Sequence, residues 1–295
     1  MPRRQRRALL IAGNGFIGSR VAIRLAEEGH SVFVHHGGAQ ALPVHANIQG
    51  VAVPRTPPPI TTYPTETLTF DPDVAIHFYC MGASDGEAFR RSFDGKAGRL
   101  VLISSCDVYR AYGRFIKTDI GAPDPTPIDE RAPPRDARFP YRRKAQSHDA
   151  LEYWYDKIDA ERALGAVQFS ETVMLRLPKV YGRGGERLET VYGFAHHPNW
   201  RWTHGHVENV AAAIALAAMC PDAAGEILNI GEASTPTMGE RLAALPRRDD
   251  TAISADEYDF RQDLDFSTEK IRRKLGFRDV VDEFSAMRRL AEAIA

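Results

Sequence analysis

Short apolar runs alternate with helical patterns along the first two thirds of the chain. Apolar runs lie at residues 8–12, 31–35, 74–79 and 100–104, and an amphipathic helical pattern lies at residues 19–28. The run Leu100-Val101-Leu102-Ile103 has no polar break, as expected for a strand whose two faces are both covered by helices. The alternation predicts strand–helix–strand units and a parallel sheet.

Two proline-rich stretches interrupt this pattern. Residues 54–64 hold so many prolines that a crossover helix there must be short or absent. Residues 123–140 are predicted to be a surface excursion. Beyond them we expect a helix at 149–164, a strand at 172–177, an Ala-rich helix at 207–219 and a short strand at 226–230. Roughly the last forty residues are expected to be helical.

Composition narrows the classes of function. The 295 residues allow one large domain or two modest ones, and 38 Lys+Arg against 39 Asp+Glu give a charge of -1, which excludes nucleic acid and acidic membranes as main partners. No run reaches the ~18 apolar residues that cross a bilayer. The three cysteines, Cys80, Cys106 and Cys220, lie far apart, which argues against a disulfide framework and favours the cytoplasm.

A glycine-rich turn follows the first predicted strand and opens the first predicted helix. It reads Gly13-Asn14-Gly15-Phe16-Ile17-Gly18. In a dinucleotide-binding fingerprint the first of these glycines permits a tight turn, the second lets the backbone approach a pyrophosphate, and the third lets the helix pack on the strand. Amides at the helix N-terminus would then bind the phosphate charge. The turn predicts a site for NAD or NADP, and a plain turn without a ligand is the alternative.

The end of the second predicted strand usually distinguishes the two cofactors. An acidic side chain there bonds the adenosine ribose, whereas a basic one accepts the 2′-phosphate of NADP. Here the chain reads His35-His36-Gly37-Gly38, which supplies neither signal. The missing acid removes the main reason to prefer NAD, and Arg55 could reach a phosphate, so NADP is slightly favoured.

A tyrosine and a lysine stand four residues apart in the helical pattern at 149–164. On one helix, Tyr153 and Lys157 would share a face about one turn apart and could act on the same substrate atom. The spacing alone is a weak signal. Its value comes from the glycine turn, from the serine-rich strand end at Ser104-Ser105, and from Glu161 four residues beyond Lys157.

With these residues the chain resembles the extended short-chain dehydrogenase/reductase family, also called the NAD-dependent epimerase/dehydratase family. The resemblance runs nearly from end to end. Besides the glycine turn it rests on Ser104-Ser105-Cys106-Asp107-Val108-Tyr109, on Tyr153-x-x-x-Lys157-x-x-x-Glu161, on Met174-Leu175-Arg176-Leu177-Pro178-Lys179-Val180-Tyr181-Gly182, and on residues 227–231 and 267–277.

The resemblance implies an α/β fold, a Rossmann doubly wound parallel sheet with a smaller C-terminal substrate domain. Residues 1–177 would form the dinucleotide-binding domain, and residues 178–295 a smaller substrate-binding region with some segments returning to the sheet. The implied reaction moves a hydride between nicotinamide and a hydroxyl-bearing carbon of a nucleotide sugar or similar small molecule. Family members commonly dimerise through two helices of the Rossmann domain, so a homodimer is also expected.

The resemblance also assigns roles to particular residues. Tyr153 would be the acid or base, Lys157 would stabilise its phenolate, and Ser105 would hydrogen-bond the reacting oxygen. The residues expected to bind the cofactor are Gly13, Asn14, Gly15, Phe16, Ile17, Gly18, His36, Tyr79, Lys157 and Pro178. We expect no metal, because His196, His197, His204 and His206 lack accompanying cysteines or a helical histidine pair.

Departures from the family pattern leave other functions open. Cys106 and Asp107 stand where dehydratases of the family carry an Asp-Glu pair, which disfavours a sugar dehydratase. Ala12 replaces the first glycine of the family turn. The alternatives are a simple NADPH-dependent carbonyl reductase and a cofactor-binding sensor or interaction protein without catalysis. Trp200 and Trp202 could wall a substrate pocket or belong to the core.

Overall fold

The computed structural model describes residues 5–38, 40–53, 59–185, 188–248 and 255–293. Arg55 therefore lies outside the described residues. The chain divides into two compact units, the first formed by residues 1–104, 139–175 and 211–227 and the second by residues 105–138, 176–210 and 228–295. No helix among the described residues is long and apolar enough to cross a membrane.

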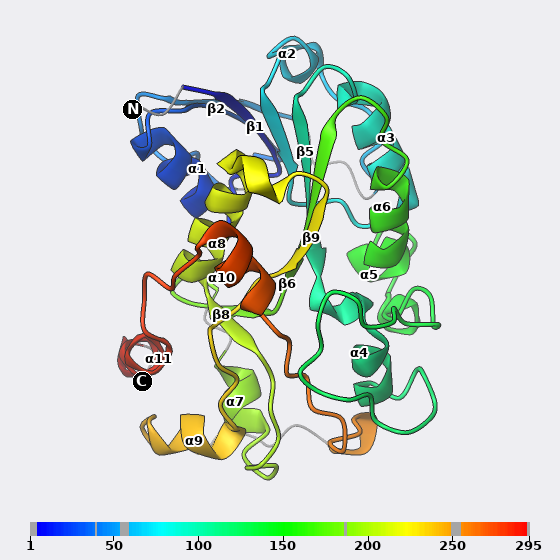
Figure 1. Cartoon of the computed structure of the whole chain (residues 1–295), viewed down its shortest axis with the longest axis vertical. Helices are drawn as coiled ribbons and strands as arrows, with labels where there is room; N and C mark the ends of the chain where they lie inside the picture. Colours follow the sequence, from blue (N-terminus) through cyan, green and yellow to red (C-terminus); the bar gives the residue numbers. More distant parts are fainter. Residues whose placement is uncertain (1–4, 39, 54–58, 186–187, 249–254, 294–295) are drawn as a thin grey trace. The chain divides into compact units, whose positions relative to one another are not determined.

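A seven-stranded sheet with the order β3-β2-β1-β4-β5-β6-β9 organises the first unit (Figure 1). The pairs β3–β2, β2–β1, β1–β4 and β4–β5 are parallel, as the sequence predicts. The strands are β1 (Arg7–Ile11), β2 (Ser31–His36), β3 (Ile48–Ala52), β4 (Val74–His77), β5 (Arg99–Ser105), β6 (Glu171–Leu177) and β9 (Glu226–Asn229).

Helices cover both faces of this sheet (Figure 1). On one side lie α1 (Gly18–Glu27) and α8 (Val207–Met219), and on the other α3 (Ala83–Phe93) and α6 (Lys157–Leu164). The chain also forms the short α2 (Thr65–Leu68) and α5 (Leu151–Trp154) and the 3-10 turns η2 (Arg142–Lys144) and η3 (Pro221–Ala223). The four-residue α2 directly after Pro64 agrees with the short crossover helix expected there.

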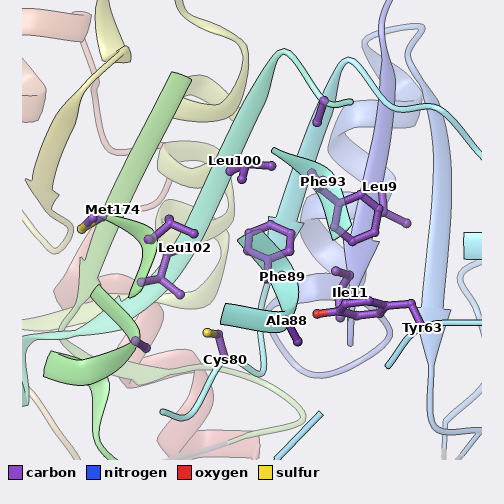
Figure 2. Packing of buried hydrophobic residues seen from close by; sticks show 14 residues of the cluster. Leu9, Ile11, Tyr63, Cys80, Ala88, Phe89, Phe93, Leu100, Leu102 and Met174 are labelled. Carbon is purple, nitrogen blue, oxygen red and sulfur yellow. The ribbon is translucent and has the colours of Figure 1, made fainter. Parts of the chain in front are cut away.

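The core beneath α3 and α6 is built from aromatic and branched side chains (Figure 2). Phe89 and Phe93, one turn apart on α3, pack with Leu9 of β1 and with Leu100 and Leu102 of β5. All five side chains are fully buried. Burial of these side chains removes apolar surface from water on this face of the sheet. Helices cover the other face as well, so β1 and β5 carry apolar side chains on both of their faces.

The second unit contains a two-stranded parallel sheet of β7 (Lys179–Tyr181) and β8 (His204–His206). Its helices are α4 (Arg110–Phe115), α7 (Glu189–Gly193), α9 (Met238–Ala243), α10 (Glu269–Leu275) and α11 (Glu283–Ala293), with the 3-10 turns η1 (Cys106–Val108) and η4 (Ala255–Glu257). The expectation that the end of the chain is helical holds for α10 and α11 only. Gly276, at φ +70, closes α10 in the left-handed region that favours glycine.

The predicted surface excursion at residues 123–140 holds for most of the stretch, where residues are exposed or half-buried, but Ile128 and Arg135 are buried. Ile128 is 1% exposed, and its amide donates to the Asp265 carbonyl at 2.7 Å. The amide of Arg135, also buried, donates to the Val108 carbonyl at 2.7 Å. The stretch contains apolar and hydrogen-bonding groups that the second unit buries, and proline content alone does not indicate this.

Candidate active site

The glycine turn connects β1 to α1 and depends on two glycines for steric reasons. A Cβ at Gly13 would lie 2.5 Å from Cβ of Leu10, and one at Gly18 would lie 2.7 Å from the Gly13 carbonyl oxygen. No real side chain fits at either distance, so the strand and helix can approach each other only with glycine at both positions. Ala12 adopts φ +57, a left-handed conformation in which glycine would be unstrained.

Gly15 faces open space at the start of α1. A Cβ at this position would meet no atom within 4 Å. Helix α1 has no side-chain cap at its N-terminus and no acidic residue in its first turn. The amides of Ser19 and Arg20 in its first turn donate to the carbonyls of Gly15 and Ile17, at 3.0 Å and 3.1 Å. The start of α1 therefore offers a phosphate beside Gly15 the positive end of the helix dipole. These residues fit the pyrophosphate of a dinucleotide.

Asn14 and His36 link the glycine turn to the end of β2. The Gly38 amide donates to Nδ1 of His36 at 3.2 Å, which places the proton of the neutral ring on Nε2. The Asn14 side chain lies 3.4 Å from the same ring nitrogen and donates to the Gln40 carbonyl at 2.8 Å. Burial lowers the pKa of His36, so its ring is neutral near pH 7.

The prediction of one helix through Tyr153 and Lys157 is wrong. Helix α5 ends at Trp154 and α6 begins at Lys157, with Tyr155 and Asp156 extended between them. Asp156 is the N-cap of α6, since its carboxylate accepts from the Ile158 amide at 3.2 Å and from the Phe139 amide at 2.9 Å. Aspartate favours this position over a helix interior, so the helical pattern is interrupted here.

Tyr153 packs into the loop that precedes α5. The Arg142 guanidinium carbon lies 4.6 Å from the centre of its ring, and Nε of Arg142 donates to its carbonyl at 3.0 Å. The His148 ring lies 4.3 Å from it on another side. Tyr153 is half-buried, and its ring also packs against Trp154 with ring centres 5.3 Å apart.

Lys157 is 4% exposed, and two main-chain carbonyl oxygens, one just after β4 and one in β5, hold its ammonium in place. Nζ donates to the carbonyls of Cys80 at 2.8 Å and Ile103 at 3.0 Å. Nearby, the Ser104 hydroxyl donates to Glu161 at 2.6 Å, which ties the end of β5 to α6. Lys157 therefore lies beside the carboxyl ends of parallel strands, where ligands bind in open α/β sheets.

The Tyr155 ring lies beside Lys157, and the sequence pattern does not single this tyrosine out. The centre of its ring lies 5.8 Å from Nζ of Lys157. The Tyr141 ring packs against it at 5.1 Å. The available signal was the aspartate between Tyr155 and Lys157, because an N-cap there interrupts the helix and separates Tyr153 from the lysine.

The other predicted site residues have the following places. Ser105 ends β5, and its Oγ accepts from the Asp107 amide at 3.2 Å, which leaves its hydroxyl proton able to donate. Tyr79 follows β4, half-buried, with its amide donating to Nδ1 of His77 at 3.2 Å. Pro178, between β6 and β7 in the second unit, lies against Gly205, where a Cβ would be 3.0 Å from its ring.

His197 and His204, in the histidine-rich segment, make packing and main-chain contacts. His197 stacks on Phe260 with ring centres 3.5 Å apart, and His204, fully buried, interacts through Nδ1 with the Trp202 carbonyl at 2.7 Å. Trp200 is 3% exposed and stacks on Phe115, so it belongs to the core. Among the residues that the structure describes, no group of histidine, cysteine and acidic side chains could hold a metal ion.

Comparison with solved structures places this fold among known proteins. The epimerase Mth375 from Methanothermobacter thermautotrophicus matches with a TM-score of 0.68 and 16% identity over 98% of this chain and 93% of that one. The Bordetella bronchiseptica enzyme WbmG, in complex with NAD and UDP, matches with a TM-score of 0.65 and 15% identity over 96% and 92%. MoeE5, in complex with UDP-glucuronic acid and NAD, matches with a TM-score of 0.66 and 18% identity over 98% and 99%.

These likenesses are in three-dimensional structure rather than in sequence. No protein-family model matches the chain, and no curated protein matches it. At identities of 15% to 18% the comparisons establish the fold and leave the chemistry to be argued from the residues. The predicted Rossmann-like α/β fold is confirmed, and the resemblance noted in the sequence is supported at the level of fold.

Proposed function

We propose that this chain is an NAD(P)-dependent oxidoreductase or epimerase that acts on a nucleotide sugar. The observation that carries the proposal is the pairing, in one unit, of an uncapped helix start beside Gly15 with a buried ammonium at Lys157. The first suits the phosphates of a dinucleotide, and the second suits proton transfer at a hydroxyl-bearing carbon.

Each proposed catalytic residue has a distinct task. A nicotinamide supplies hydride transfer when it is bound. Lys157 holds a positive charge near a tyrosine of the segment that leads into it, for which the sequence motif favours Tyr153, and so stabilises the phenolate form. The Ser105 hydroxyl donates a hydrogen bond to the substrate oxygen and so orients that oxygen. Tyr79 and Pro178 are proposed to line the cofactor site.

The choice of cofactor follows from the end of β2. A neutral His36 offers an N–H donor to the adenosine ribose and does not repel a 2′-phosphate as an ionised acid would. We therefore propose that NADP binds at least as well as NAD. The neighbours WbmG and MoeE5, both crystallised with NAD, support the use of a nicotinamide dinucleotide in general.

The nucleotide-sugar substrate is proposed from the same neighbours, whose structures hold UDP and UDP-glucuronic acid.

A homodimer stays part of the proposal. The outward surfaces of α3 and α6 carry exposed ion pairs, Arg91 with Glu87 at 3.6 Å and Arg162 with Asp159 at 3.4 Å, so an interface there would be polar. The free cysteines support a reducing compartment, and we propose the cytoplasm.

The test is turnover of UDP-glucose, UDP-galactose and UDP-glucuronic acid by the purified full chain with NAD or NADP, followed by proton NMR and by nicotinamide absorbance. We expect an epimeric product without net change of the cofactor. Net consumption of NADPH with a carbonyl substrate would favour the simple reductase instead. Tight cofactor binding without turnover of any substrate would favour the sensor, and absence of cofactor binding would contradict the proposal.

A further inference from the structure

We propose that Asp85 is a positioning residue for Lys157 and acts through residues 80–82, the stretch of chain that leads into α3. The inference rests on the proposed function, because Lys157 is the ammonium to which that proposal gives a task. It adds a residue on which the candidate site depends and which no sequence motif singles out. Asp85, Lys157 and residues 80–82 all belong to the first unit.

Both oxygens of the Asp85 carboxylate accept hydrogen bonds from the main chain. Asp85 is the third residue of α3 and is fully buried. Its Oδ1 accepts from the Ile60 amide at 2.7 Å, and its Oδ2 accepts from the amides of Met81 at 3.3 Å and Gly82 at 3.1 Å. An acidic side chain at this helix position can reach back to the residue that starts the helix. Asp85 thus joins residues 81 and 82 to a segment more than twenty residues earlier in the chain.

Residues 80–82 also contact the start of α6, through two of their carbonyl groups. The Cys80 carbonyl accepts from Nζ of Lys157 at 2.8 Å. The Met81 carbonyl accepts from the Asp156 amide at 2.6 Å. One short stretch of main chain therefore lies between the Asp85 carboxylate and the lysine of the candidate site.

Each of these two carbonyls shares a planar peptide group with an amide that Asp85 holds. The Cys80 carbonyl and the Met81 amide belong to one peptide group, and the Met81 carbonyl and the Gly82 amide belong to the next. In a trans peptide group the carbonyl and the amide point in opposite directions. When Asp85 fixes the two amides, it therefore also directs the two carbonyls toward Lys157 and Asp156.

The charge of Asp85 acts in the same sense as this geometry. Burial raises the pKa of Asp85, while the three amides and the charge of Lys157 lower it. Attraction between opposite charges is mutual, so the carboxylate also stabilises the ammonium. The Ile103 carbonyl, at 3.0 Å from Nζ, holds the ammonium from β5. Loss of the Asp85 carboxylate should therefore leave Lys157 fixed from one side only.

Asp94, at the other end of α3, provides a matched control. Its carboxylate also accepts three amides, those of Gln168, Phe169 and Ser170, each at 2.9 Å. These bonds hold the connection between α6 and β6 rather than residues 80–82. Asp94→Asn therefore changes the same kind of group on the same helix without touching the acceptors of Lys157.

The first experiment needs no substrate and follows the Lys157 ammonium by NMR in the full chain with isotope-labelled lysine, its signal assigned with Lys157→Met. Asp85→Asn keeps the size of the side chain, but the new amide nitrogen cannot accept a hydrogen bond. Weakening one hydrogen bond to Nζ should make the ammonium protons exchange with water about 10-fold faster in Asp85→Asn. Asp94→Asn should leave this rate unchanged. Equal rates in the parent and Asp85→Asn, or an equal increase in both variants, would overturn the inference.

If Asp85→Asn does not fold, the parent chain still decides the question. The exchange of the Met81 and Gly82 amides and of the Lys157 ammonium is then measured at several low concentrations of urea. Groups that are released by one shared opening respond equally to urea. We expect the same dependence for all three groups. An ammonium that exchanges with a different dependence from the two amides would contradict the inference.

Turnover of UDP-sugars separates this inference from the proposed function. We expect Asp85→Asn to lower kcat by about 10-fold with KM changed only a few-fold, because the variant displaces a group that acts in the chemical step. Asp94→Asn should keep both values near those of the parent. A parental kcat in Asp85→Asn would overturn the inference and leave the proposed function intact. A parent that turns over no nucleotide sugar would contradict the proposed function, and ammonium exchange would still decide whether Asp85 positions Lys157.

Discussion

Lys157 in the first unit and Arg241 in the second are both buried, and their charges are held in different ways. Lys157 in the first unit donates to the carbonyls of Cys80 and Ile103, which carry no formal charge. Arg241 in the second unit, fully buried on α9, forms an ion pair with Glu283 at 2.8 Å. Lys157 also acts through its charge on the buried Asp85 carboxylate, whose pKa it helps to lower, whereas the Arg241 guanidinium bonds a carboxylate directly and is largely neutralised by it.

The groups around Arg241 include further buried carboxyl groups. Burial raises the pKa of Glu283 although Arg241 acts the other way, which indicates that desolvation of this pair is costly. Glu232, facing Glu283 and Asp279, accepts from the His206 amide at 2.6 Å and from Asn209 at 2.8 Å. Arg241 is thus held by a structural ion pair, and the different surroundings of Lys157 support the role proposed for it.

The largest effect is expected at the ion pair of the second unit. Glu283→Gln leaves Arg241 buried without its countercharge, and we expect the free energy of unfolding to fall by about 3 kcal/mol. Chemical denaturation measures it. Glu87→Gln, which breaks an exposed pair with Arg91, is the control and should change stability by less than about 0.5 kcal/mol. Equal losses in the two variants would show that Arg241 does not depend on its partner.

The next effect concerns the start of α6. Asp156→Ala removes the cap of that helix and the acceptor of the Phe139 amide, so we expect a loss of about 2 kcal/mol in denaturant unfolding. Asp159→Ala, in the first turn of the same helix but with an exposed ion pair, should cost much less. If both variants are equally stable, the cap does not explain the break between α5 and α6.

The pH dependence of stability separates the units further. Burial raises the pKa of Glu232 to about 8 from 4.5, so between these values the folded chain keeps a proton that the unfolded chain has lost. Stability therefore falls as pH rises through this window, by about 1.4 kcal/mol per pH unit for one proton. Glu232→Gln should remove this slope and leave a constant offset, because one of its two hydrogen bonds is lost.

His35 in the first unit acts with the opposite sign. Burial lowers its pKa to about 4 from 6.5, so stability rises with pH between these values. The Glu232 slope is thus best measured as the difference between the parent and Glu232→Gln in thermal unfolding between about pH 5 and about pH 8, because His35 contributes equally to both proteins. A parent and a Glu232→Gln variant with parallel curves there would contradict the assignment.

The smallest change in stability is expected at Lys157. In Lys157→Met the cost of burying the ammonium disappears while two carbonyls lose their donor, and these effects offset to less than about 1 kcal/mol. The flexible methionine fills similar space. Denaturant unfolding measures the change beside Glu283→Gln. A loss at Lys157 as large as that at Glu283 would mean that this lysine, too, is structural.

The parts of the fold that follow from local pattern were predictable. Strand β5 appears in the sequence as an unbroken apolar run, because helices bury both of its faces. The glycine turn appears because Gly13 and Gly18 are sterically required. Helix α3 was missed, since its start depends on Asp85, whose carboxylate accepts from the distant Ile60 amide at 2.7 Å as well as from Gly82.

The same kind of distant contact explains the error at the candidate site. The apolar pattern of a helix continues across Tyr155 and Asp156, and the one local signal against a single helix is Asp156, which favours an N-cap. The interruption is fixed by the bond from the Asp156 amide to the Met81 carbonyl at 2.6 Å and by the Phe139 amide on its carboxylate. These partners lie far away in sequence, so the spacing alone predicted one continuous helix through Tyr153 and Lys157.

The most direct test of the account is NAD and NADP binding by isothermal titration calorimetry to the parent chain and to Gly15→Val. A Cβ at Gly15 would meet no atom within 4 Å, so we expect the variant to fold with little change in stability. It would, however, fill the space beside the start of α1 that we assign to the phosphates. The account predicts saturable binding to the parent and none to Gly15→Val. A parent that binds neither dinucleotide, or a variant that binds equally well, would contradict it.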